Sequence, residues 1–333
     1  MATPIQLYYV PLRENDLIDD FEGINAGDVA ENGFIRSLTS IAVAAPGTVI
    51  WYDHWEDGYE LSYGDTVSQT STAIWGDGNT GNDGVASLDG FITGIDNSDV
   101  FAGGESIILE NPVDLSTLGD LGDFNFDGAR IVVSFPVAVT KAAYPTVNGE
   151  PGGAPGSLLA GAVEVFASDR YGTEFVAPIG ENTSSSTGAF EQTAIHIMAA
   201  QDNTEVFLNT GGGPVLQGTI NAGRTLRLDE IDAGDVITTS NPAQATIVAG
   251  DVGSNYEMRW YALAPREQWS NDYYTPVFGQ RPEAQSITTD TQVWLYNPGN
   301  SAITVTMSVD GNATFDSITI QPGESELSDP IPN

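Results

Sequence analysis

Short runs of alternating apolar and polar residues, roughly four to eight residues long, recur along the chain between turn-forming residues. The runs Ala194–Ala200 and Glu205–Asn209 alternate in this way, and Gln201-Asp-Asn-Thr separates them. Asp, Asn and Thr between two alternating runs are typical of a β-hairpin. Similar pairs of runs flank Ala45-Pro-Gly and Asn297-Pro-Gly-Asn. The pattern therefore predicts antiparallel strands joined by tight turns.

Helical periodicity is weak throughout the sequence. No window of ~12 residues keeps the 3.6-residue apolar period of a long helix, and the best candidate, Pro265 to Trp269, is a single turn. The 37 Gly and 18 Pro separate short β-branched runs, which is typical of an all-β protein. We therefore predict an all-β fold.

An aromatic-rich phrase that ends in Pro occurs three times, at Pro11, Pro178 and Pro276. The second and third copies stay in step, because Pro178 and Pro276 lie 98 residues apart, as do Ile195 and Val293. A fixed period indicates that one supersecondary unit is used repeatedly.

The repeats divide the chain into a first β unit with long loop insertions (1–171), a second unit (172–269) and a truncated third unit (270–333). The third unit lacks a counterpart of the run Ala245–Ala249, so we expect a longer parent chain with further domains. The units are predicted to be tandem antiparallel β-sandwich-like repeats. A β-propeller is the alternative, because four-stranded blades also repeat with hairpins and Gly-rich turns.

The charge of the chain is strongly one-sided. Its 333 residues hold 46 Asp and Glu against 10 Lys and Arg, a net charge of −36, and Lys141 is the one lysine. Such a field repels nucleic acid and anionic lipid, which argues against both as partners. It also opposes compaction, so we expect a need for divalent cations or high salt. No apolar run approaches the ~18 residues of a membrane span.

Two acidic loops are candidate calcium sites. Asp123, Asn125 and Asp127 place oxygen ligands at alternate positions before Gly128, as in the first half of a calcium loop, but Ser134 stands where an EF-hand has its bidentate Glu. The second loop, which is rich in Gly, carries Asp77, Asn79 and Asp83. The alternative for both loops is a plain surface turn.

A third cluster is a candidate ligand-binding site. Within eight residues it combines carboxylates, a His and two aromatic side chains, namely Asp53, His54, Trp55, Glu56, Asp57 and Tyr59. Carboxylates beside aromatic platforms suit sugar binding, or a glycoside hydrolase that uses Glu56 and Asp57 if the carboxyl groups have the required separation. The alternative is a structural turn whose aromatic side chains cap the core.

Other catalytic arrangements have little support in the sequence. The chain has two His and no Cys, which argues against a His-based zinc site, disulfides and thiolate chemistry. No G-x-S-x-G context surrounds the serines at 184–186. His196 stands between Ile195 and Ile197, so strand alternation predicts that it faces away from the core.

Several phrases together resemble one protein family. They are Thr48-Val-Ile-Trp-Tyr-Asp-His-Trp-Glu-Asp-Gly-Tyr-Glu, Trp75-Gly-Asp-Gly-Asn, Gly172-Thr-Glu-Phe-Val-Ala-Pro and Asp251-Val-Gly-Ser-Asn-Tyr-Glu. The chain is similar, over most of residues 5 to 330, to the IgGFc-binding protein N-terminal domain family, as found in large secreted bacterial surface proteins. The resemblance implies an extracellular module of mainly β structure and brings no catalytic residues. Antibody binding belongs to the animal members and is not carried over.

These observations predict an extracellular structural or adhesive surface module, non-catalytic and stabilised by Ca²⁺ at its acidic loops. Its expected partners are other surface or matrix proteins or glycans. The alternatives are a carbohydrate- or protein-binding module, or a glycoside hydrolase that uses Glu56 and Asp57.

Overall fold

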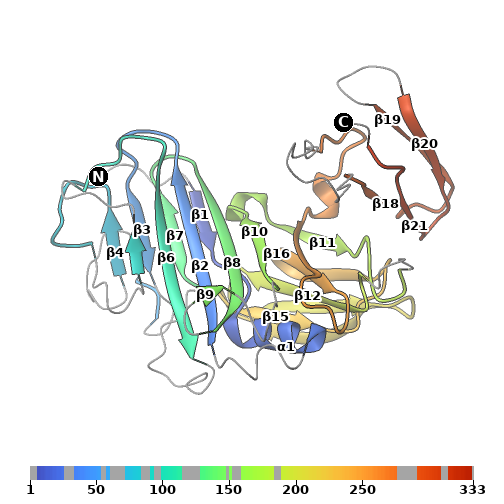
Figure 1. Ribbon diagram of the computed structural model, residues 1–333, viewed down its shortest axis with the longest axis horizontal. Coiled ribbons are helices and arrows are strands. Elements are labelled where there is room, and N and C mark those ends of the chain that lie inside the picture. The colour runs from blue at the N-terminus through green and yellow to red at the C-terminus, as the bar shows by residue number, and fades with distance from the viewer. Residues whose placement is uncertain are drawn as a thin grey trace.

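The computed structural model describes twelve segments of the chain, namely residues 6–25, 34–53, 58–60, 72–83, 91–93, 99–114, 128–147, 150–151, 159–183, 189–275, 291–308 and 314–331. Their regular structure is almost entirely β, and all of their strand pairs are antiparallel, as the sequence predicts. Figure 1 shows the strands in three groups, the first at the left, the second beside it and the third at the upper right.

The first group is a sandwich of two sheets. One sheet has the strand order β1-β7-β3-β4, with β1 at Gln6–Tyr9, β7 at Arg130–Val133, β3 at Ile50–Asp53 and β4 at Thr72–Trp75. The other has the order β10-β8-β2-β6-β5, with β10 at Gly161–Val165, β8 at Val137–Val147, β2 at Phe34–Val43, β6 at Glu105–Asp114 and β5 at Phe91–Thr93. A short strand, β9 (Glu150–Pro151), pairs with β8. Buried side chains of both sheets, such as Ile41 and Tyr52, form one core.

The second group repeats this pairing order. Its strands are β11 (Gly172–Val176), β12 (Gln192–Ala199), β13 (Thr204–Asn209), β14 (Val215–Ile220), β15 (Thr225–Leu228), β16 (Val236–Gly250) and β17 (Met258–Leu263). The long strand β16 takes the place of both β7 and β8. Its first part lies between β11 and β13, and its second part lies between β12 and β17.

The change of sheet falls at a proline in both units. Pro242 lies between the two parts of β16, and Pro136 lies between β7 and β8. Proline has no N–H to donate to a ladder, so it suits the point where a strand leaves one sheet for the other. The same topology in two consecutive units confirms the predicted β-sandwich repeats, and the strands do not form propeller blades.

The third group contains two strand pairs that match pairs of the second unit. β18 (Trp294–Tyr296) pairs with β21 (Ser325–Leu327) as β12 pairs with β15, and β19 (Ile303–Ser308) pairs with β20 (Thr314–Ile320) as β13 pairs with β14. Trp294 follows its counterpart His196 by 98 residues, the period seen in the sequence. The domain boundaries at 171/172 and 269/270 stay a prediction.

The predicted hairpins are wrong in one respect. β12 and β13 are consecutive but do not pair with each other, because β12 pairs with β15 and β16 while β13 pairs with β14 and β16. The turn Gln201-Asp-Asn-Thr therefore carries the chain from one sheet to the facing sheet. The turns between β2 and β3 and between β18 and β19 do the same. Turn residues predict that the chain reverses direction, but they do not indicate with which strand the next segment pairs.

The expected absence of an ordinary helix is also wrong. Residues Glu14–Ile24 form the 11-residue helix α1. Two single turns, η2 (Ser168–Arg170) and η3 (Arg266–Gln268), lie between units, and η3 falls at the predicted helical turn. Acidic side chains in the first turn of α1 suit its positive end, and Leu17, Phe21 and Ile24 form its buried stripe. The apolar period of this helix is hard to recognise in the sequence, because its buried positions include the charged residues Glu14 and Asp20.

A further core joins the first two units. Helix α1 supplies Leu17, Phe21 and Ile24, the first unit adds Ile35 and Val163, and the second adds Val248, Met258 and Trp260. Figure 1 shows the blue helix α1 lying below strands of the second unit. The ring of Trp260 packs on Gly161, where an added Cβ would lie 2.0 Å from ring atoms. The units therefore meet through an apolar interface, and α1 is inserted at this interface.

Candidate functional site

The predicted ligand cluster begins at the end of β3. Asp53 is 5% exposed and lies opposite Arg130 of β7 in the strand register. The Arg130 guanidinium contacts Asp53 Oδ2 at 2.6 Å and also donates to the carbonyl oxygen of Glu60 at 2.7 Å. The backbone N–H of Glu60 donates to the same Asp53 oxygen at 3.1 Å. These bonds fix Asp53 and Glu60 around one guanidinium.

Tyr59 closes this cluster and reaches the second unit. The Arg130 guanidinium lies 4.9 Å from the centre of its ring, and Tyr9 packs edge-on against it at 5.7 Å. The Tyr59 hydroxyl donates to the carbonyl oxygen of Gly128. Burial raises the pKa of Tyr59, so it stays a neutral donor. A Cβ on Gly223 would lie 1.6 Å from the hydroxyl oxygen, so the turn before β15 requires a glycine here.

Asp53 has a raised pKa at this site. Burial, with a further contribution from the Glu60 carboxyl group, raises the pKa of Asp53 from 3.8 to about 7. Asp53 Oδ1 and Glu60 Oε2 are both buried without a hydrogen-bond donor among the described residues. Asp53 can therefore gain or lose a proton near neutral pH.

The other predicted members of this cluster, His54, Trp55, Glu56 and Asp57, lie outside the described residues. The structure thus brings Asp53 and Tyr59 together. It confirms that Glu60, the last residue of the same acidic run, lies beside them, and it adds Arg130, which sequence reasoning missed. Arg130 lies 77 residues from Asp53, so only strand pairing brings the two residues together.

The predicted loop at Asp77, Asn79 and Asp83 follows β4 and is organised around Asp99. The carboxylate of Asp99, 1% exposed, accepts the backbone N–H groups of four consecutive residues, 76 to 79, at 2.5 to 3.2 Å. Asp77 accepts the N–H of Asn79 and the side-chain amide of Asn82. The loop therefore binds a carboxylate of this chain in the way that such backbone nests bind anions.

Asp83 has a raised pKa in this loop. Burial, with the nearby Asp99 and Asp77 carboxylates, raises its pKa from 3.8 to about 6. Its Oδ1 is buried without a hydrogen-bond partner among the described residues. Asp123, Asn125 and Asp127 of the other calcium candidate lie outside the described part of the chain. Within that part, no three His, Cys, Asp or Glu side chains are grouped so that they could hold a metal ion.

Two ionic contacts of α1 are the strongest polar feature that sequence reasoning missed. Glu14 and Lys141 of β8 are both fully buried, with 2.7 Å between Glu14 Oε1 and Lys141 Nζ. Ser37 of β2 donates to Glu14 at 2.5 Å, and Lys141 contacts the Ser37 hydroxyl at 2.5 Å. The one lysine of the chain therefore forms a buried ion pair inside the first unit.

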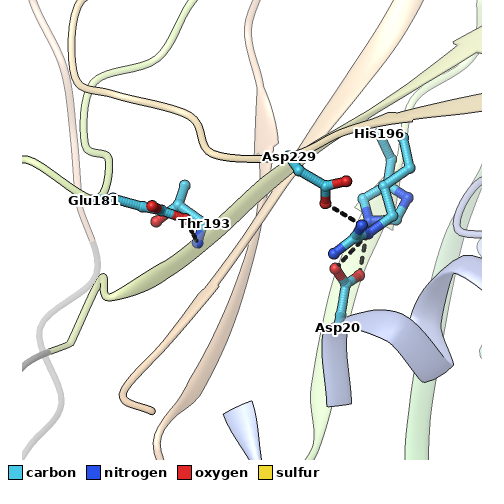
Figure 2. A network of polar contacts seen from close by, with 6 residues as sticks. Asp20, Glu181, Thr193, His196 and Asp229 are labelled. Atoms are coloured by element: carbon cyan, nitrogen blue, oxygen red, sulfur yellow. Dashed lines mark hydrogen bonds and ion pairs between the residues drawn. The ribbon is translucent and has the colours of Figure 1, made fainter. Parts of the chain in front are cut away.

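The second contact reaches the other unit. Asp20 of α1 is fully buried and accepts from His196 Nε2 of β12 and Arg227 Nε of β15, both at 2.8 Å. Figure 2 shows Asp20 pointing from the helix toward His196. Asp229 also contacts the Arg227 guanidinium. The same view shows Glu181, which accepts the N–H of Thr193 at 3.3 Å within the second unit. His196 faces away from the core, as predicted, but α1 covers it.

The charge of Arg227 is favoured by this arrangement. Burial lowers its pKa, but Asp20 and Asp229 raise it further, so the pKa lies above its usual value. His196 is 1% exposed, and its Nδ1 has no hydrogen-bond partner among the described residues. The Asp20 carboxylate, held between Arg227 and His196, positions helix α1 on the sheet. The three side chains join the helix to the sheet and do not line an open surface.

The fold and these contacts define a tandem β-sandwich module whose first two units share a core. The chain belongs to the IgGFc-binding protein family: the family model described as IgGFc binding protein matches residues 108–331. The match begins in β6 and runs through β21. This is a family of binding modules, and the match does not establish a bacterial source. No curated protein matches the chain.

One further finding concerns membranes. Among the residues that the structure describes, no helix combines the length and the apolar character needed to cross a bilayer.

Proposed function

We propose that the chain is an extracellular, non-catalytic module that binds other proteins and serves a structural or adhesive role at a cell surface. Membership of a family of binding modules supports the binding role. The acidic surface, with a net charge of −36, supports a protein or glycan partner over nucleic acid.

The observation that carries this proposal is the insertion of α1 between the first two sandwiches. Its two buried carboxylates pair with different units. Glu14 pairs with Lys141 of the first unit. Asp20 pairs with His196 and Arg227 of the second unit. Removing one partner of such a pair is strongly destabilising, so sliding of the two units would be costly. A scaffold of this kind presents its loops in fixed relative positions, which favours binding by reducing the ordering cost.

We assign the binding surface to the predicted ligand cluster, namely residues 54–57 with Asp53 and Tyr59. The described residues on either side of 54–57 are held by buried contacts, since Asp53 is bound by Arg130 and Tyr59 donates to Gly128. The Trp of this cluster is the residue type most often found at the centre of protein interfaces.

The proposal is tested with the chain on a biosensor surface, exposed to an array of secreted and matrix proteins and to a glycan array. We expect at least one protein to bind, and Trp55→Ala to weaken that binding about 30-fold or more, as for an aromatic hot spot. The matched control is Trp269→Ala, which changes the same residue type at the end of the second unit. Binding of glycans alone would replace the proposal with the carbohydrate-binding alternative. Glycoside turnover that Glu56→Gln abolishes would establish the hydrolase.

We also propose that Ca²⁺ stiffens the acidic loops at Asp77–Asp83 and Asp123–Asp127. For the first loop, two observations support this: Asp83 Oδ1 is buried with no hydrogen-bond partner among the described residues, and the pKa of Asp83 is raised. A divalent cation would relieve both. The test is thermal unfolding with chelator and then with added Ca²⁺. We expect the chelator to lower the melting temperature and Ca²⁺, but not NaCl, to restore it. Equal melting temperatures in chelator and in Ca²⁺ would show that calcium does not stabilise the fold.

A further inference from the structure

The core of the first unit holds a lysine and a glutamate whose reactive groups are in contact. Both side chains, Glu14 of α1 and Lys141 of β8, are fully buried, and Lys141 Nζ lies 2.7 Å from Glu14 Oε1. The hydroxyl of Ser37 in β2 contacts both groups, because it donates to Glu14 Oε1 and accepts from Lys141 Nζ, each at 2.5 Å. Ser37 is itself fully buried. An amine, a carboxyl group and a hydroxyl are therefore held together away from solvent.

The surroundings of this cluster are largely apolar. In the strand register Lys141 lies opposite Thr39 of β2 and Val163 of β10, which are both buried. Val163 belongs to the same core as Leu17 of helix α1 and Ala143 of β8. Charged groups are costly in such a place, and desolvation is one of the ways in which proteins turn a lysine amine into a nucleophile.

We propose that Glu14 and Lys141 form an isopeptide bond after the chain has folded. The ion pair is the starting state, and transfer of one proton, directly or through the Ser37 hydroxyl, gives a neutral amine and a carboxylic acid. Lys141 Nζ then attacks Glu14 Cδ. The Nζ–Cδ bond forms, the bond from Cδ to the protonated oxygen breaks, and that oxygen leaves as water with one proton from Nζ. The step is balanced without a co-reactant.

Two effects favour the amide over the ion pair. Well-oriented intramolecular reactions reach effective molarities of about 10⁵–10⁸ M, and the contact between Nζ and Oε1 places the two groups for such a reaction. The amide also replaces two buried charges by one neutral group, which removes the cost of keeping both ions away from water.

The bond would fix helix α1 to strand β8. The two residues are 127 positions apart in the sequence, and a cross-link over so long a stretch restricts the unfolded chain strongly. The chain has no Cys, so a disulfide cannot serve this purpose. The proposal is independent of the binding surface around Asp53, so either can fail alone.

The test is the mass of the wild-type chain, which requires no variant. We expect the denatured chain to be lighter than its sequence by the mass of one water molecule. Trypsin cleaves after each Arg and after Lys141, the one lysine. The cross-link should block cleavage at Lys141 and join peptide 14–36 to peptide 131–170. Fragmentation of the joined peptide locates the bond, which distinguishes it from loss of water elsewhere in the chain.

The matched control is Lys141→Arg. It keeps a positive charge beside Glu14 and a tryptic site at position 141, but a guanidinium stays protonated in proteins and is no nucleophile. We expect this variant to have its full mass and to release peptides 14–36 and 131–141 separately.

Two results would overturn the proposal. One is a wild-type chain that releases peptides 14–36 and 131–141 separately, both after purification and after prolonged incubation at mildly alkaline pH. The other is a joined peptide that persists in Lys141→Arg.

Discussion

Asp53 lies buried beside Arg130 and Glu60, and its raised pKa is the clearest property of the candidate site at the residue scale. The pKa of Asp53 is raised from 3.8 to about 7 by burial and by Glu60. The folded chain therefore holds a proton that the unfolded chain releases at lower pH. The stabilising contribution is fully present below pH 3.8 and is lost as pH rises toward about 7.

Glu60→Gln should lower the pKa of Asp53 by roughly one unit, because it removes the neighbouring carboxylate while Arg130 remains. The variant should also lose less stability than the wild type between pH 5 and pH 8, a window of about three units across the raised pKa. Carbon-detected NMR of the Asp53 carboxyl group and urea unfolding at each pH measure the two effects. An unchanged Asp53 titration in Glu60→Gln would show that the two carboxyl groups do not interact.

Lys141→Met tests the buried pair with Glu14. Because both side chains are fully buried, the change leaves a carboxylate without its counter-ion and should destabilise the fold by about 3–5 kcal/mol. The double variant Glu14→Leu, Lys141→Met should recover most of this loss, since apolar replacement of a buried pair is often close to neutral. Urea unfolding of the single and double variants gives the interaction energy. A loss in the double variant equal to the sum of the single losses would contradict the pairing.

At the scale of elements, helix α1 is the part of the molecule that joins two sandwiches. Phe21 is fully buried and lies 6.4 Å from the ring of Trp260 in the second unit. Phe21→Ala should cost about 3–5 kcal/mol as a large-to-small core change, and should speed hydrogen exchange in β12 and β17. Glu22→Ala, on the exposed side of the same helix, is the control and should stay within about 0.5 kcal/mol. Equal effects of the two changes would mean that the helix is not docked.

Elements differ in how far the sequence predicts them. The strands at Gln192–Ala199 and Thr204–Asn209 follow from alternation, because one face of each is apolar. Helix α1 does not follow, because the partners of Glu14 and Asp20, namely Lys141, His196 and Arg227, lie more than a hundred residues away. Two buried carboxylates on a helix look like surface residues until those partners are known. The same holds for Arg130, which joins the candidate site only through strand pairing.

At the scale of the whole molecule, the 98-residue period predicts repetition, and the shared strand order confirms it. The period does not predict that consecutive strands lie in facing sheets, since turn residues alone do not identify the neighbours of a strand. It also does not predict the joint between units. That joint depends on α1 and on Gly161, whose missing side chain leaves room for Trp260.

Our central claim is that the first two sandwiches form one rigid body, and distance measurement by pulsed electron spin resonance tests it most directly. Spin labels at Ala42→Cys and Glu205→Cys, both exposed, report across the units, and labels at Glu205→Cys and Tyr261→Cys report within the second unit. We predict one inter-unit distance whose distribution is as narrow as that of the pair within one unit. A broad or two-peaked inter-unit distribution beside a narrow intra-unit one would contradict the claim.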